Sequence, residues 1–87
     1  MPRLIVVYDF QAERTSLPRK FLRQYLTHVQ YSVFEGDVTK GDAKEIKQKL
    51  KQMREPGESV IIYDIYNPSL DRTVYGDDEL DDNKFIE

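Results

Sequence analysis

Two short segments dense in apolar residues, Arg3 to Phe10 and Ser59 to Tyr66, constrain the fold of this 87-residue chain most strongly. The first run, β-branched and aromatic with almost no polar interruption, is typical of a central strand that is buried on both faces, and the second is another strongly apolar strand. The chain contains no cysteine, so neither a disulfide nor a thiolate metal cage can support the fold. We therefore expect one small domain built around these strands, in a cytoplasmic protein.

Two amphipathic segments lie between the apolar ones. In the first, Ser16 is a candidate N-cap and Pro18 suits the first helical turn. Its apolar and basic residues then fall on opposite sides of a helix, with Leu17, Phe21, Leu22, Tyr25, Leu26 and Val29 against Arg19, Lys20, Arg23 and Thr27. The second segment begins with a capping box at 39–42 and stops at Pro56-Gly57. The pattern predicts two helices, each with a basic face.

The segment at 29–38 is extended but changes phase. Val29, Tyr31 and Val33 alternate with polar residues, and the alternation shifts at Phe34 before Gly36. This indicates either one strand with a bulge or two short strands joined by a tight bend. With a further short strand at 72–75, the order of elements predicts an α+β sandwich, most simply a ferredoxin-like β-α-β-β-α-β fold.

Charge is distributed unevenly along the chain. The net charge is −3, but six acidic residues against Lys84 give residues 76–87 a charge of −5, which leaves +2 on residues 1–75. We expect a ferredoxin-like domain at 1–76 and an acidic C-terminal tail at 77–87. No apolar run approaches the ~20 residues of a membrane span, so no membrane contact is expected. A domain this small leaves much surface uncovered, which favours a homodimer.

Asp9 is the most informative candidate for chemistry, because it ends the first apolar strand, at an edge where ligands tend to bind. An aspartate at this place can also simply cap or turn the chain. Mg²⁺ often uses one or two carboxylates together with water and phosphate oxygens. Two Asp9 side chains meeting at a twofold axis would repel unless a cation lay between them.

The other side chains give weaker evidence for a catalytic or binding role. His28 is the only histidine, and at a helix end it more often faces the helix dipole than acts as a base. Zinc, thiol and Ser-His-Asp mechanisms lack the necessary residues, and the four glycines form no nucleotide-binding loop. The best phosphate-contact candidates are the cations after the first strand, Arg14, Arg19, Lys20 and Arg23, although such a face is often only solvated. Tyr8 and Phe34 could stack on bases or belong to the core.

A more specific pattern combines VVYDF (6–10), RKFLRQYL (19–26), VQYSVFEGDV (29–38) and SVIIY (59–63). Over residues 3–66 the chain resembles the small CRISPR-associated nuclease subunit of spacer acquisition, the partner of the CRISPR integrase. The resemblance implies a ferredoxin-like homodimer, two short strands at 29–38, and a C-terminal strand at 72–75 that pairs with the sheet of the partner protomer.

The resemblance also implies a site. The family's metal-binding aspartate corresponds to Asp9, which Tyr8 precedes, and the family's phenylalanine corresponds to Phe34. The arginines that follow the first strand in the family are matched loosely by Arg14 and Arg19. His28 stands where the family often has arginine, and Asp64 matches no known role. Such proteins are Mg²⁺-dependent phosphodiesterases for single-stranded RNA or DNA, and they bridge integrase dimers and bind duplex DNA. We expect the scaffold role to be the physiological one, with endonuclease activity as a further property. A toxin-like ribonuclease and a ferredoxin-like ligand- or protein-binding module without catalysis remain the alternatives.

Overall fold

The structure is a computed structural model that describes residues 2–66 and 69–77. Within these residues, five strands and two α-helices follow one another along the chain. They are β1 (Arg3–Asp9), α1 (Ser16–Leu22), β2 (Thr27–Gln30), β3 (Val33–Asp37), α2 (Lys40–Met53), β4 (Ser59–Tyr66) and β5 (Ser69–Tyr75), with a 3-10 turn, η1 (Ala12–Arg14), after β1.

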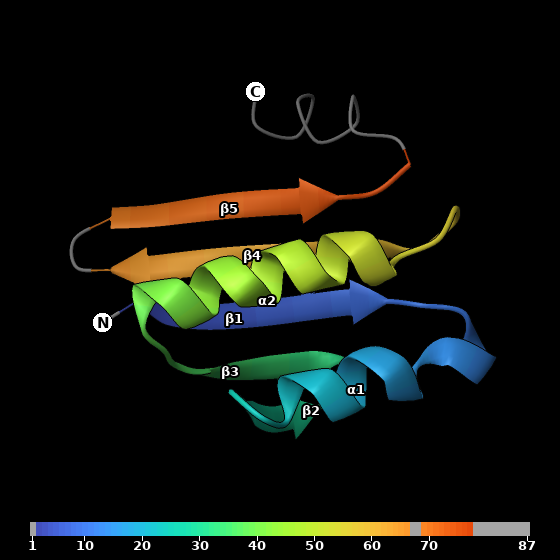
Figure 1. The fold of residues 1–87 in the computed structure, drawn as a ribbon, viewed down its shortest axis with the longest axis horizontal. Helices are drawn as coiled ribbons and strands as arrows, with labels where there is room; N and C mark the ends of the chain where they lie inside the picture. The colour runs from blue at the N-terminus through green and yellow to red at the C-terminus, as the bar shows by residue number, and fades with distance from the viewer. Residues whose placement is uncertain (1, 67–68, 78–87) are drawn as a thin grey trace.

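The strands form one antiparallel sheet in the order β2-β3-β1-β4-β5 (Figure 1). Its first four strands have the arrangement of a ferredoxin-like sandwich, which confirms the α+β prediction. The fifth strand is longer than the predicted 72–75 segment. It also pairs with β4 of its own chain along its whole length, from Val60 opposite Tyr75 to Tyr66 opposite Ser69, whereas we expected it on the sheet of a partner protomer.

Both helices cover the same face of the sheet (Figure 1), and the core lies between them and the sheet. In β1 the side chains of Leu4, Val6 and Tyr8 are buried, while Ile5 and Val7 on the other face are only half-buried. Two-sided burial of β1 was therefore a wrong expectation for the single chain. Burial alternates along this strand because one face of the sheet is covered by the helices and the other face is open.

The first helix is shorter than its apolar spacing indicated. It ends at Leu22, and the amide groups of Gln24 and Tyr25 bond to carbonyls only three residues back, 3.2 and 2.9 Å away. Residues 27–30 then pair with β3 as β2. Leu26 still reaches the core from the intervening turn, which explains why it fits the helical pattern. Pairing with a neighbouring strand here overrides the local helical period.

The segment after α1 contains both a tight bend between two short strands and an irregular register, the two alternatives that the phase change indicated. Two strands are joined at Tyr31 and Ser32, where Tyr31 takes the left-handed backbone conformation with φ 44°. The register of β2 against β3 also shifts between His28 and Gln30. The implied pair of short strands is confirmed, and His28 lies in β2 rather than at a helix end.

The second helix agrees with its prediction. Thr39 is the N-cap, and its side-chain oxygen accepts a hydrogen bond from the amide of Asp42 at 3.0 Å. Ala43, Ile46 and Leu50 face the core. The predicted acidic tail lies, apart from Asp77, outside the described residues. In the described part of the chain, no helix is long and apolar enough to cross a membrane.

Candidate active site

Asp9 is the last residue of β1, and its side chain is exposed. It lies opposite Ser59 of β4 and follows Ile5 and Val7 in the alternation of β1, so it belongs to the open face of the sheet. Its carboxylate has no hydrogen bond or ion pair with any of the residues 2–66 and 69–77. Both of its oxygens are therefore available to a ligand.

Tyr8, the neighbouring residue, points to the helical side and is 4% exposed. Burial raises the pKa of its hydroxyl, and the positive charges of Arg19 and Arg23, together with a hydrogen bond to Ser32, act in the opposite direction. The hydroxyl is thus neutral near pH 7 and can serve as a hydrogen-bond donor but not as a base. The Ser32 carbonyl also accepts a hydrogen bond from the Tyr8 amide at 3.1 Å, so the turn between β2 and β3 lies beside the end of β1.

Phe34 is fully buried in the core, where it stacks on Tyr8 with ring centroids 6.2 Å apart. The His28 ring lies nearly parallel to it at 4.6 Å. The structure thus gives Phe34 a packing role that holds Tyr8 and His28, and it does not present the Phe34 ring to a nucleic-acid base.

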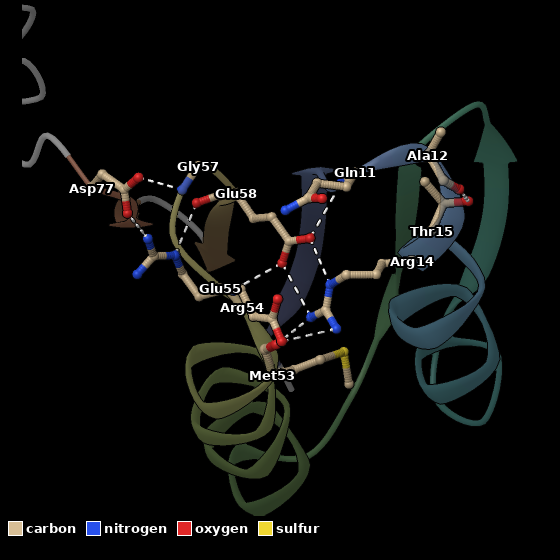
Figure 2. Close-up of polar contacts among 10 residues, drawn as sticks. All are labelled: Gln11, Ala12, Arg14, Thr15, Met53, Arg54, Glu55, Gly57, Glu58 and Asp77. Atoms are coloured by element: carbon tan, nitrogen blue, oxygen red, sulfur yellow. Dashed lines mark hydrogen bonds and ion pairs between the residues drawn. The ribbon is translucent and has the colours of Figure 1, made fainter.

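The cations after the first strand separate into two groups. Arg19 is half-buried, Lys20 and Arg23 are exposed, and these three form no ion pair with any described residue. The guanidinium of Arg14, by contrast, contacts Glu58 at 2.7 Å, the Met53 carbonyl at 2.8 Å and Glu55 at 3.3 Å (Figure 2). Arg14 is thus held in an internal network, while the phosphate role predicted for it stays a prediction.

Glu58 is the residue that sequence reasoning missed. Its carboxylate is completely buried, and it also accepts hydrogen bonds from the amides of Gln11 and Glu55, at 3.2 and 2.9 Å (Figure 2). The hydrogen bond from Arg14 lowers the pKa of Glu58 despite burial, with help from these amides. This network ties the loop that follows Asp9 to the loop that precedes β4. Glu58 stands one place before an apolar strand, and nothing in its local pattern distinguishes it from a solvated acid.

Arg54 adds a second link at the same end of the sheet. Its side chain contacts the Asp77 carboxylate, which also accepts from the amide of Gly57 (Figure 2). Gly57 has φ +89°, a conformation that favours glycine. The end of β5 is thereby attached to the turn between α2 and β4.

Asp64 lies away from this site, because it pairs with Leu4 near the start of β1. One of its oxygens contacts Lys47, and the other is buried without a hydrogen-bond partner. In the part of the chain that the structure describes, no three His, Cys, Asp or Glu residues gather in a way that could hold a metal ion.

The open face of the sheet is apolar in the middle. Ile5 lies opposite Tyr63, Val7 lies between Val33 and Ile61, and all five are half-buried. At the end of the sheet where β1 begins, Arg3 contacts Glu35 at 2.7 Å and Asp37 at 3.2 Å. Asp9 therefore lies at the border of an uncovered apolar surface, at the end of β1 opposite to these ion pairs.

Comparison with known proteins agrees with this geometry. The family model of CRISPR associated protein Cas2 matches residues 1–73. A Haloferax volcanii protein named CRISPR-associated endoribonuclease Cas2 is 39% identical over 84 residues, covering 95% of this chain and 98% of the relative. A Pyrococcus furiosus protein of the same name is 49% identical over 61 residues, 69% of this chain and 72% of the relative.

A solved structure described as a crystal structure of Cas2 is also similar. It has a TM-score of 0.70 and 39% identity, and the match covers 74% of each chain. The resemblance carried by the segments VVYDF and VQYSVFEGDV is thus confirmed across most of the sequence, and the chain belongs to the CRISPR associated protein Cas2 family.

Proposed function

We propose that the chain is an endoribonuclease that works as a homodimer, with the two Asp9 carboxylates forming one Mg²⁺-dependent centre. The observation that carries this proposal is the free, exposed Asp9 carboxylate at the border of an uncovered apolar face. The endoribonuclease names of the Haloferax volcanii and Pyrococcus furiosus relatives support the reaction class.

Two copies packed through the open face would cover Ile5, Val7 and Tyr63 of each protomer. A twofold axis through this face, near the ends of the two β1 strands, would bring one Asp9 close to the other. Burying the apolar surface favours association, while the two carboxylates would repel without a cation between them. Dimer formation and cation binding would therefore support each other.

The donor set fits Mg²⁺. Carboxylate oxygens are the ligands that this ion prefers, and it usually retains several waters beside one or two carboxylates. Asp9 offers two oxygens that no cationic side chain of the described residues occupies. When bound, Mg²⁺ supplies positive charge that polarises a phosphate oxygen.

The remaining chemistry falls to side chains at the same end of the sheet. Arg19 and Arg23 attract the phosphate backbone and offset negative charge that develops in the transition state. Tyr8 is neutral and 4% exposed on the helical side, so it does not act as the base. The Arg14–Glu58 pair holds the loop that follows Asp9.

The decisive experiment replaces Asp9 with asparagine, which keeps the shape and removes the charge. The Asp9→Asn variant should remain a folded dimer and lose Mg²⁺-dependent cleavage of single-stranded RNA. Glu13→Gln, which neutralises an exposed carboxylate in η1, is the matched control and should cleave normally. Unchanged cleavage by purified Asp9→Asn would remove the catalytic proposal.

The dimer needs its own test. Ile5→Lys places a charge in the middle of the open face, so light scattering should detect single protomers and cleavage should fall together with dimerisation. Leu17→Lys, on α1 and 44% exposed, should keep the dimer. A fully active Ile5→Lys monomer would contradict a shared centre.

We also propose, as a second role, that the dimer is a scaffold in CRISPR adaptation that bridges integrase subunits and binds duplex DNA. Three cations that form no ion pair within residues 2–66 and 69–77, Arg19, Lys20 and Arg23, favour this role, because phosphate contacts require no catalytic group. Reversing the charge of Arg19 and Arg23 should weaken duplex binding and flatten its salt dependence, while Lys49→Glu on the exposed side of α2 should change both less. Co-purification of an integrase subunit from the native host would test the bridging role directly.

A further inference from the structure

Tyr31 is an aromatic residue that the fold holds out into solvent. Its side chain is 85% exposed, the highest value among the exposed large hydrophobic residues of the described chain. It forms the turn between β2 and β3 with φ 44°, in the left-handed region that glycine and asparagine adopt most easily. A bulky residue in that conformation and without burial contributes little to folding, which points to another use for the ring.

The turn around Tyr31 is fixed by its neighbours. The Tyr31 carbonyl lies 2.6 Å from Nε2 of His28, and the His28 ring is stacked on the buried Phe34. On the other side, the Ser32 carbonyl accepts a hydrogen bond from the amide of Tyr8 at 3.1 Å. The ring therefore projects from a well-anchored backbone.

This turn lies at the same end of the sheet as Asp9. Val33 pairs with Val7, so the turn before Val33 adjoins the last residues of β1. The bond from Tyr8 to Ser32 places the two segments side by side. Strand pairing therefore brings the exposed Tyr31 ring to the end of β1 that carries the exposed Asp9 carboxylate, and the charges of Arg19 and Arg23 act on the Tyr8 hydroxyl from the helical side of the same end.

We propose that Tyr31 is a stacking platform for an unpaired base of single-stranded RNA, next to the phosphodiester bond held at Asp9. An exposed aromatic side chain beside cations is how proteins hold single strands, because every base has a stacking face while the charges follow the backbone. Bases in the interior of a duplex are already stacked on both faces and cannot lie on the ring. The inference rests on the proposed function and adds to it the residue that holds a base of the single-stranded substrate.

The test compares Tyr31→Gly, Tyr31→Phe and Tyr66→Ala with the wild type, without Mg²⁺, by fluorescence anisotropy with a labelled single-stranded oligoribonucleotide and its duplex. Tyr31→Gly should weaken single-strand binding roughly 5- to 150-fold, the range expected for losing one stacked base. Duplex binding should change less than about twofold. Tyr31→Phe keeps the ring and should bind as the wild type does, as should Tyr66→Ala, which removes an exposed tyrosine elsewhere.

The same variants separate stacking from a structural role. Because glycine adopts positive φ without strain, Tyr31→Gly should have an unchanged or higher Tm while its RNA affinity falls. A lower Tm, an unchanged single-strand affinity, or an equal loss for duplex and single strand would overturn the inference. If Tyr31→Gly binds normally while Asp9→Asn is inactive, only the stacking role fails. If Asp9→Asn cleaves normally, the catalytic proposal fails and the binding comparison still decides the role of Tyr31.

Discussion

The buried carboxylate of Glu58 should be worth a large share of this domain's stability, and Glu58→Gln tests it with almost no change in shape. The carboxylate receives four N–H groups, two of them from the Arg14 guanidinium. A carboxamide has one accepting oxygen, and its amino group would face donors. Hydrogen bonds to charged groups contribute ~1.5–3 kcal/mol, and leaving a buried donor unsatisfied adds to the loss.

Two features keep the expected cost near the lower end of that range. The Arg14 side chain is 20% exposed, so solvent screens part of its charge, and it retains Glu55 and the Met53 carbonyl as partners. We expect Glu58→Gln to lower the free energy of unfolding by about 2 kcal/mol at pH 7. For a domain of this size that corresponds to a Tm lower by about 10 °C.

The pH dependence distinguishes lost charge from lost packing. The pKa of Glu58 is lowered in the folded state, so its stabilisation is complete above the ordinary value of 4.5 and disappears as the pH falls through the lowered value. Glutamine does not titrate. The difference in unfolding free energy between wild type and variant should therefore shrink in acid and nearly vanish at the lowest pH at which both still fold.

Urea denaturation followed by circular dichroism, at one fixed protomer concentration, measures both quantities. Glu55→Gln is the control, because it changes a 55% exposed partner of the same arginine and should cost less than about 0.5 kcal/mol. A difference between Glu58→Gln and wild type that is as large in acid as at pH 7 would refute the electrostatic explanation. So would a Glu58→Gln variant as stable as the wild type.

Three further substitutions test single features of the fold by the same denaturation measurement. Thr39→Ala removes the cap of α2 and should cost about 1 kcal/mol, whereas Thr39→Ser should cost much less; equal losses would show that the cap hydrogen bond is unimportant. Gly57→Ala should cost about 1 kcal/mol because of φ +89°, although a Cβ there has open space, so a neutral result would contradict the conformational reason. Leu50→Ala should cost 2–5 kcal/mol, about the usual loss for a fully buried leucine, and a loss below 1 kcal/mol would mean that the core under α2 closes around the cavity.

Much of the fold could be predicted from local patterns. The apolar strands β1 and β4 and the capped helix α2 appear where spacing and caps placed them, because each carries its own strong signal. The first helix was predicted too long. Tyr25, Leu26 and Val29 fit the helical period, but hydrogen bonding to β3 is available to residues 27–30 and not to a local pattern.

The candidate site was predictable only in part. Asp9 could be chosen because it ends the first strand, and Arg19 and Arg23 because they lie on the basic side of the helical segment that follows. Phe34 was singled out by resemblance, and the structure buries it. Arg14 looked equivalent to Arg19, and its partner Glu58 lies 44 residues away in sequence. No local signal can pair two residues so far apart.

By itself, the sequence determined the strands β1 and β4 and the helix α2, because apolar period, caps and breakers act over a few neighbouring residues. It also determined that an acidic side chain would end the first strand. Only the tertiary structure decided which face of the sheet is covered, which arginine is consumed by an internal ion pair, and that Tyr31 lies beside Tyr8 and Asp9. Those outcomes depend on strand pairing and packing between distant segments, whose free energies exceed the local preferences they override.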